Sequence, residues 1–223
     1  DNYLNAAIAR VLTRGRRVYL SARVQNNHVA LTSKPTTMSY TNLCHQGKSH
    51  MELDEIYFFT ASINRWMPLL APDTTKQIIV SALDYLTKQN KMDVFAFVIM
   101  PTHIHFIWRA RSLNGKEHPK GSFLKYTAHE FKKLLSFDPL ILLSCFKINA
   151  HNKNYEFWQK DPLAIILYTR KVAFQKLDYI HFNPCAGKWK LVEDPCDYYF
   201  SSAAFYEKGI KDFSFLRDIR DEF

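Results

Sequence analysis

The apolar residues of the chain fall into regular patterns from residue 56 onward. Ile56–Ile63 is a run of β-branched and aromatic residues, which is typical of a strand. Met92–Ile99 and His103–Arg109 have the same character and predict two further strands. The turn between them contains Pro101, which suits a turn because proline cannot donate to a strand ladder. We therefore expect three strands in this part of the chain.

Three other segments carry apolar residues at helical spacing. Asp73 and Ser122 are suitable N-caps for the first two. The third must end before Pro184, because proline disfavours helical geometry at the preceding residue. The pattern over Ile141–Ile148 fits a short strand or a short helix equally well. We expect helices over residues 73–90, 122–135 and 163–183, the last with a break near Thr169.

The order of these elements is strand, helix, two strands, helix and helix. This order indicates an α+β fold with helices on one face of a sheet. We expect the domain to span residues 51–210 and to be followed by a C-terminal tail over residues 211–223. Residues 1–50 are rich in Arg, Asn, Ser and Thr, and Met38 is a candidate start. We expect them to be a basic extension that is poorly ordered or non-native.

The overall composition is that of a folded globular protein. The 223 residues are 47% hydrophobic and include only six glycines. No apolar run approaches the roughly 20 residues of a membrane-spanning helix, so we expect no membrane partner. The four cysteines form no Cys-x-x-Cys pair, which argues against a zinc finger or a disulfide scaffold and suits a reducing cytoplasm.

The net charge of +9 suggests a polyanionic partner, but the charge is unevenly distributed. Residues 1–50 hold seven Lys/Arg and one acid, which gives +6, whereas residues 51–223 hold 23 basic and 20 acidic residues, which gives +3. Residues 109–133 hold seven basic and two acidic residues. On charge alone, a solvated helix face explains this segment better than a DNA-binding surface does.

Two histidines occupy alternate positions in the third predicted strand. Side chains two residues apart in a strand point to the same face, so His103 and His105 project together. Ile104 and Phe106 project from the other face. A pair of imidazoles on an apolar strand is suited to bind a metal, although a bare His-x-His also arises by chance in partly buried strands.

The end of the third predicted helix supplies a second pair of polar residues. Tyr179 and Asn183 are four residues apart and share a helix face, about 6 Å apart along the axis. A tyrosine oxygen can act as a nucleophile, and an amide oxygen can bind a hard cation. Two imidazoles and the Asn183 amide oxygen together would leave coordination positions open on Mg²⁺ or Mn²⁺, and phosphate oxygens could fill them. A plainer reading also fits, in which Tyr179 caps a core and Asn183 caps the helix.

Two motifs together resemble a known family. Residues 100–105 (Met-Pro-Thr-His-Ile-His) and 178–184 (Asp-Tyr-Ile-His-Phe-Asn-Pro) resemble those of the REP-associated tyrosine transposases. These are relatives of the single-strand insertion-sequence transposases in the HUH group. The resemblance covers residues 56–206. Thr102 and Cys185 depart from it, because the family usually has asparagine and a branched aliphatic residue at these places. Further matches are residues 157–159 (Phe-Trp-Gln), Gly187 and residues 199–203 (Tyr-Phe-Ser-Ser-Ala).

The resemblance implies a compact α+β domain of the HUH nuclease type. Its central antiparallel sheet would be ferredoxin-like or RRM-like, with helices packed on it. By similarity, His103, His105 and Asn183 would bind Mg²⁺ or Mn²⁺, and Tyr179 would be the nucleophile. The product would be a reversible 5′-phosphotyrosine link to single-stranded DNA at a palindromic hairpin. The resemblance further implies a nucleoid-associated protein of the cytoplasm, which acts as a monomer or as a homodimer.

Further side chains are candidates for contacts to DNA. Trp108 and Trp158 are candidates for stacking on bases, and a place in the core fits them at least as well. Basic residues near the predicted site are candidates for contacts to phosphates, which position DNA without reading its sequence. These basic residues are Arg109, Arg111, Lys125, Lys132 and Lys133.

Two other functions remain open at this point. One is a DNA-hairpin-binding protein that is derived from a transposase and does not catalyse a reaction. The other is a His-x-His metallohydrolase, in which water replaces Tyr179 as the nucleophile. A covalent adduct between Tyr179 and DNA would separate the tyrosine transposase from both.

Overall fold

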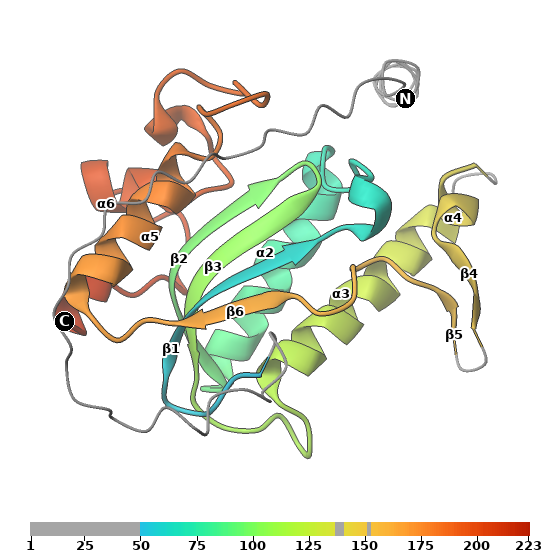
Figure 1. The fold of residues 1–223 in the computed structure, drawn as a ribbon, viewed down its shortest axis with the longest axis horizontal. Coiled ribbons are helices and arrows are strands. Elements are labelled where there is room, and N and C mark those ends of the chain that lie inside the picture. The colour runs from blue at the N-terminus through green and yellow to red at the C-terminus, as the bar shows by residue number, and fades with distance from the viewer. Residues whose placement is uncertain (1–49, 137–140, 151–152) are drawn as a thin grey trace, which may run out of the picture. The chain divides into compact units, whose positions relative to one another are not determined.

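The computed structural model describes residues 50–136, 141–150 and 153–223. The described residues all lie within one compact unit of the chain, residues 47–223. The predictions for residues 1–50 therefore lie outside the described residues, except at His50. The elements (Figure 1) are β1 (Ile56–Ser62), η1 (Asn64–Trp66), α2 (Asp73–Lys88), β2 (Met92–Met100), β3 (His103–Ala110), α3 (Pro119–Ser136), α4 (Ile141–Cys145), β4 (Lys147–Ala150), β5 (Lys153–Tyr155), β6 (Leu163–Ile166), α5 (Arg170–Phe182), η2 (Pro195–Asp197), α6 (Ala203–Lys208) and η3 (Ile219–Asp221).

Four strands form one antiparallel sheet in the order β2-β3-β1-β6 (Figure 1). In the chain, α2 lies between β1 and β2, and α3 lies between β3 and β6. This is the ferredoxin-like arrangement of two split βαβ units that share a sheet. The predicted α+β fold with a central antiparallel sheet is confirmed. The strands β4 and β5 pair separately as a small hairpin.

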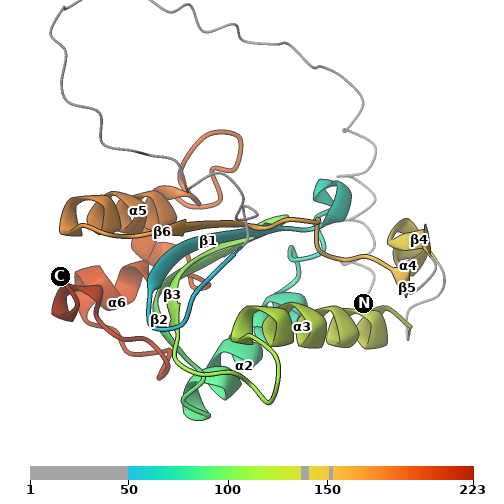
Figure 2. The same cartoon turned by 60° about the horizontal axis from the view of Figure 1, so that its bottom comes forward.

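Helices cover both faces of the sheet, whereas the sequence predicted helices on one face. α2 and α3 lie on one side, and α5 lies on the other (Figure 2). The strands are apolar on both faces, so each face needs a cover to exclude water. The helical periodicity of residues 170–182 gave no information on which face α5 would cover.

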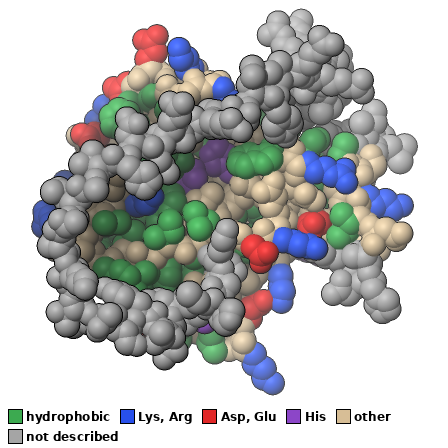
Figure 3. All heavy atoms as spheres, viewed as in Figure 1, with side chains coloured by type: hydrophobic (Ala, Val, Ile, Leu, Met, Phe, Trp, Pro, Cys, Tyr) green, Lys and Arg blue, Asp and Glu red, His purple; other side chains and the backbone are tan. Residues whose placement is uncertain are grey.

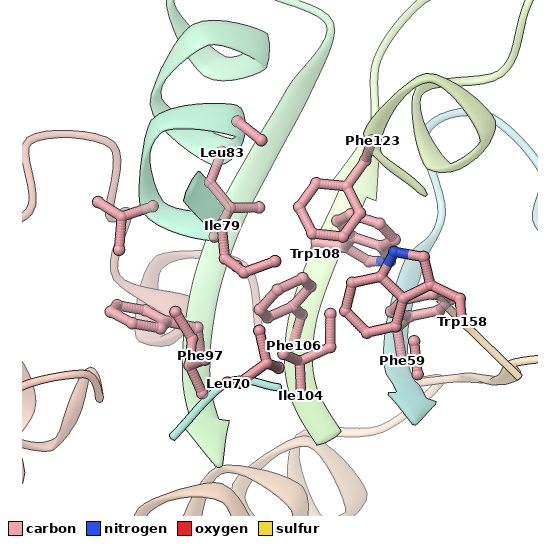
Figure 4. Close-up of a cluster of buried hydrophobic side chains, with 14 of the residues drawn as sticks. Phe59, Leu70, Ile79, Leu83, Phe97, Ile104, Phe106, Trp108, Phe123 and Trp158 are labelled. Carbon is pink, nitrogen blue, oxygen red and sulfur yellow. The ribbon is translucent and has the colours of Figure 1, made fainter. Parts of the chain in front are cut away.

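The core under α2 and α3 is rich in aromatic rings. Phe59, Phe106 and Trp108 project from neighbouring strands and pack together, and Phe106 and Trp108 also meet Phe123 of α3 (Figure 4). Trp158 completes this cluster and donates a hydrogen bond from Nε1 to Thr127 Oγ1 at 3.0 Å. On the opposite face, strand residues Phe58, Val98 and Ile107 belong to a second core with Ala173, Leu177 and Ile180 of α5.

The stretch predicted as one broken helix over residues 163–183 is a strand followed by a helix. β6 (Leu163–Ile166) pairs with β1, so a distant strand decides the conformation of an ambiguous apolar run. Thr169 is the N-cap of α5, and its side chain accepts a hydrogen bond from the Val172 amide at 3.3 Å. The undecided stretch over residues 141–148 forms α4 and the start of β4. α3 begins at Pro119, so Ser122 lies inside that helix and is not its cap.

Residues 211–223 are an integral part of the domain, which corrects the predicted tail and its boundary at residue 210. Phe213 and Phe215 are buried in the core under α2 and α3, and Ile219 is buried in the core under α5. The Arg217 amide donates a hydrogen bond to the Val94 carbonyl at 2.9 Å, beside the β2 edge. The segment thus supplies core side chains and covers a strand edge. Among the described residues, no helix combines the length and apolarity needed to span a membrane.

Candidate functional site

His103 and His105 project from β3 toward the face that α5 covers. Their ring centroids are 4.8 Å apart, and the rings meet edge to face. The two residues are 6% and 4% exposed, so water has little access to the imidazoles. The period of two along the strand places both rings on this face and Ile104 and Phe106 in the opposite core.

Each imidazole is held through its Nδ1 atom by a threonine hydroxyl. His105 Nδ1 lies 2.7 Å from Oγ1 of Thr60, the residue directly opposite on β1. His103 Nδ1 lies 3.1 Å from Oγ1 of Thr102 in the preceding turn. In the tautomer that donates Nδ1–H to the hydroxyl, the lone pair is on Nε2. Metal-binding histidines are usually oriented by a partner in this manner.

Both imidazoles are neutral at pH 7. The pKa of His103 is lowered to about 4, mainly by burial; the Asn183 side chain partly opposes this shift, and the Lys188 charge adds to it. Burial, with smaller contributions from the nearby His103 and Lys176, lowers the pKa of His105 to about 3. A neutral imidazole keeps a lone pair, so no proton has to leave before a cation binds.

α5 brings Tyr179 and Asn183 to the two histidines. The Tyr179 ring centroid is 5.1 Å from that of His105 and 5.9 Å from that of Phe58. Tyr179 is 49% exposed, so it is open to a large ligand. Asn183 is the C-cap residue of α5, and its side chain is close enough to His103 to affect the pKa of that imidazole.

Two buried polar atoms of this group have no hydrogen-bond partner in the described structure: His105 Nε2 and Asn183 Oδ1. Buried polar atoms are normally paired, so an unpaired ring nitrogen and an unpaired amide oxygen are suited to a shared cation. No group of three or more His, Cys, Asp or Glu is placed to hold a metal among the described residues, and this site has only two such side chains, His103 and His105, beside the amide of Asn183. The donor set of two imidazoles and one amide oxygen fits Mn²⁺ better than Mg²⁺, which prefers oxygen ligands.

The site residues line a pocket of about 770 Å³. In the space-filling view, histidine side chains are visible on this face of the molecule beside hydrophobic side chains (Figure 3). The charged side chains that line the pocket are Lys176 and Lys188, and no described Asp or Glu is among its lining residues. Lys176 Nζ lies 4.8 Å from the centre of the Phe58 ring and 5.8 Å from that of Tyr179. A positive pocket without carboxylates favours an anionic ligand.

The five basic residues predicted to contact DNA lie outside this pocket. Arg109 is buried, and its guanidinium donates to the Asp93 carboxylate at 2.8 and 3.0 Å and to that of Glu222 at 2.7 Å. Arg111 donates from Nε to the same Asp93 carboxylate at 2.6 Å. Arg109 therefore ties the C-terminal segment to β2, and Arg111 ties the residue after β3 to β2, which corrects their predicted role.

The remaining predicted DNA contacts are exposed lysines of α3, on the side of the sheet opposite the pocket (Figure 2). Lys125 forms an ion pair with Glu117, and Lys133 lies 4.0 Å from Glu130. Lys132 Nζ lies 5.4 Å from the centre of the Tyr155 ring. Trp108 and Trp158, considered for base stacking, are 1% and 8% exposed and belong to the core.

Sequence reasoning missed the four residues that orient the imidazoles or give the pocket its positive charge. Lys176 carried a usable signal, because it is three residues before Tyr179 and shares its helix face. Thr102 was noted only as a departure from the family pattern. Thr60 can be found only once the β1–β3 register is known. Lys188 follows Gly187 in the loop after α5, where no periodicity applies.

Comparisons with known proteins give similarity at the level of structure. No protein-family profile matches the chain, and no curated protein matches it. Among solved structures, the chain is similar to a REP-associated tyrosine transposase bound to a REP hairpin, with 18% identity, coverage of 82% of this chain and 93% of that chain, and a TM-score of 0.49. It is also similar to a proposed transposase from Deinococcus radiodurans R1, with 16% identity, coverage of 61% and 95%, and a TM-score of 0.34. The first belongs to the family that the sequence motifs resemble.

Proposed function

We propose that the protein is a metal-dependent endonuclease and strand transferase that uses Tyr179 to cut and rejoin single-stranded DNA at hairpins. One observation carries the proposal: β3 and α5, far apart in the chain, bring His103, His105, Tyr179 and Asn183 into one positive pocket. A chance pair of strand histidines does not explain the nearby tyrosine or the unpaired amide oxygen.

The metal-binding part of the proposal assigns three residues. His103, His105 and Asn183 would hold a divalent cation, Mn²⁺ in preference to Mg²⁺, which would supply Lewis-acid polarisation of a phosphodiester. Thr60 and Thr102 orient the imidazoles for this task through their Nδ1 atoms.

The covalent step exchanges one phosphoester bond for another. The Tyr179 oxygen forms a bond to phosphorus, and the bond from phosphorus to the 3′ oxygen of the neighbouring nucleotide breaks. The phenolic proton passes to solvent, and the departing 3′ oxygen takes up a proton. The DNA is left with a 5′-phosphotyrosine link and a free 3′-hydroxyl. Attack by a 3′-hydroxyl on this link reverses the step and rejoins strands without ATP.

The charge of the pocket supports a nucleic-acid substrate over a small neutral one. Lys176 and Lys188 attract phosphates, and no described carboxylate in the pocket repels them. Tyr179 and Trp66 are about half exposed, so the pocket is open to a polymer rather than closed around a small molecule.

A covalent-adduct assay tests the proposal. The full chain is incubated with Mn²⁺ and labelled hairpin oligonucleotides from the encoding genome, each with single-stranded flanks, and then separated on a denaturing gel. We expect an adduct with the wild type and with Tyr168→Phe, a matched control because Tyr168 is 75% exposed and lies outside the pocket. We expect none with Tyr179→Phe.

Each other outcome favours a different function. Cleavage without an adduct that persists in Tyr179→Phe would identify water as the nucleophile and the chain as a metallohydrolase. Hairpin binding without cleavage under any divalent metal would identify a non-catalytic binding protein. An adduct in Tyr179→Phe would show that another residue is the nucleophile.

A further inference from the structure

Trp66 is an exposed tryptophan in the lining of the pocket. It is 55% exposed, and its ring centroid lies 5.8 Å from that of His103. The residue follows β1 in the short turn η1 and is not part of either core. Its ring is therefore held beside the site without being used to stabilise the interior.

The turn that presents Trp66 has a costly backbone conformation. Arg65 (φ 57°, ψ 20°) and Trp66 (φ 55°) both lie in the left-handed region, which residues with side chains seldom adopt. The turn is fixed by hydrogen bonds from the Asn64 amide to the Phe157 carbonyl at 2.7 Å and from Asn64 Nδ2 to the Glu156 carbonyl at 3.1 Å. Such conformations persist only where surroundings enforce them, and they concentrate at ligand sites.

A second indole lies beside the same histidine. The Trp189 ring centroid is 5.7 Å from that of His103, and Trp189 also lines the pocket. This ring is half-buried, packs against the core under α5, and has Lys188 Nζ 5.1 Å from its centre. The pocket therefore combines two indoles and an ammonium group next to a candidate metal ligand.

We propose that Trp66 is a stacking platform for an unpaired nucleobase next to the reacting phosphate, with Trp189 as a second aromatic wall. This inference rests on the proposed function, because it needs a DNA phosphate at His103 and His105. Aromatic faces stack on any base, so the platform gives affinity for single strands without sequence preference. In a duplex the bases are already stacked on one another, and the platform has nothing to bind.

The test compares two strands of equal length and charge by fluorescence anisotropy: oligo-dT and an abasic deoxyribose-phosphate strand. We expect the wild type to bind oligo-dT more tightly than the abasic strand. Trp66→Ala should weaken oligo-dT binding roughly 5- to 150-fold, the range spanned by one base–aromatic stack, and leave abasic binding unchanged. Trp66→Phe should keep most of the preference. Tyr85→Ala, a control at 58% exposure on α2, should change neither affinity.

Several results would overturn the platform. They are equal binding of both strands by the wild type, equal weakening of both strands by Trp66→Ala, or no effect of that variant. Thermal melting of Trp66→Ala and Trp66→Phe separates a folding defect from lost stacking, since Trp66→Phe retains a ring in the same turn. A wild-type protein that forms the covalent adduct but shows no preference for oligo-dT over the abasic strand would refute the platform alone. An intact preference without any adduct would refute only the proposed catalysis.

Discussion

The hydroxyl of Thr60 offers a sharp test of how the metal site is built. Thr60 lies opposite His105 across the β1–β3 pair, and its Oγ1 is 2.7 Å from His105 Nδ1. Thr60→Val removes this hydroxyl and keeps a β-branched side chain of similar shape. His105 Nδ1 then has no partner at a position where the residue is 4% exposed.

Two consequences follow from that lost hydrogen bond. A buried polar group that loses its partner costs about 1–3 kcal/mol, so the free energy of unfolding should fall by that amount. The imidazole also loses the partner that favours a lone pair on Nε2. Loss of an orienting partner of a metal ligand lowers metal affinity about 10- to 100-fold, and we expect the Mn²⁺ concentration at half-maximal adduct formation to rise accordingly.

The assay pairs urea unfolding with Mn²⁺ titration of adduct formation. Thr60→Ser restores a hydroxyl and should recover most of the metal affinity. Thr127→Val is the matched control, because Thr127 accepts a hydrogen bond from Trp158 in the opposite core and should lose stability without a change in the Mn²⁺ requirement. A Thr60→Val protein that loses only stability, as the control does, would refute the orienting role of Thr60.

Two further predictions test the charges of the molecule. Arg109→Met removes the arginine that pairs with both Asp93 and Glu222, and urea unfolding should show a loss of about 3 kcal/mol. This is the low end of the range for a broken buried pair, because Arg111 and Arg217 still pair with Asp93. Weaker DNA binding at unchanged stability would contradict this role. The proposed metal ligands are neutral and two lysines lie nearby, so the protein should bind Mn²⁺ weakly in the absence of DNA and more tightly when single-stranded DNA is bound. By linkage, Mn²⁺ should raise the affinity for single-stranded DNA by the same factor. Equal Mn²⁺ affinity in calorimetry with and without DNA would contradict that linkage.

The strands and most helices could be predicted because their patterns are local. Alternation along residues 103–109 sets the face of both histidines, and the four-residue spacing of Tyr179 and Asn183 sets their common helix face. The family pattern then supplied the expectation that the two pairs meet. The contact between His105 and Tyr179 depends on the tertiary structure, and neither spacing in the sequence predicts it.

The features that sequence could not supply depend on distant partners. Leu163–Ile166 is a strand because β1 offers an edge for it, although its own apolar run fits a helix. Arg109 was predicted to contact a phosphate, but it forms an ion pair with Glu222, which is remote in the chain. Trp66 carries no periodic signal, because its exposure follows from a turn fixed by the backbone of residues 156–157.

The most direct test of the central claim is to identify the amino acid that becomes linked to DNA. The Mn²⁺-dependent adduct with a hairpin oligonucleotide is digested with nuclease and trypsin, and the peptides are sequenced by mass spectrometry. We predict a nucleotide 5′-phosphate on Tyr179 within the peptide of residues 177–188. A nucleotide on any other residue, or strand cleavage with no nucleotide-bearing peptide, would contradict the assignment of Tyr179 as the nucleophile.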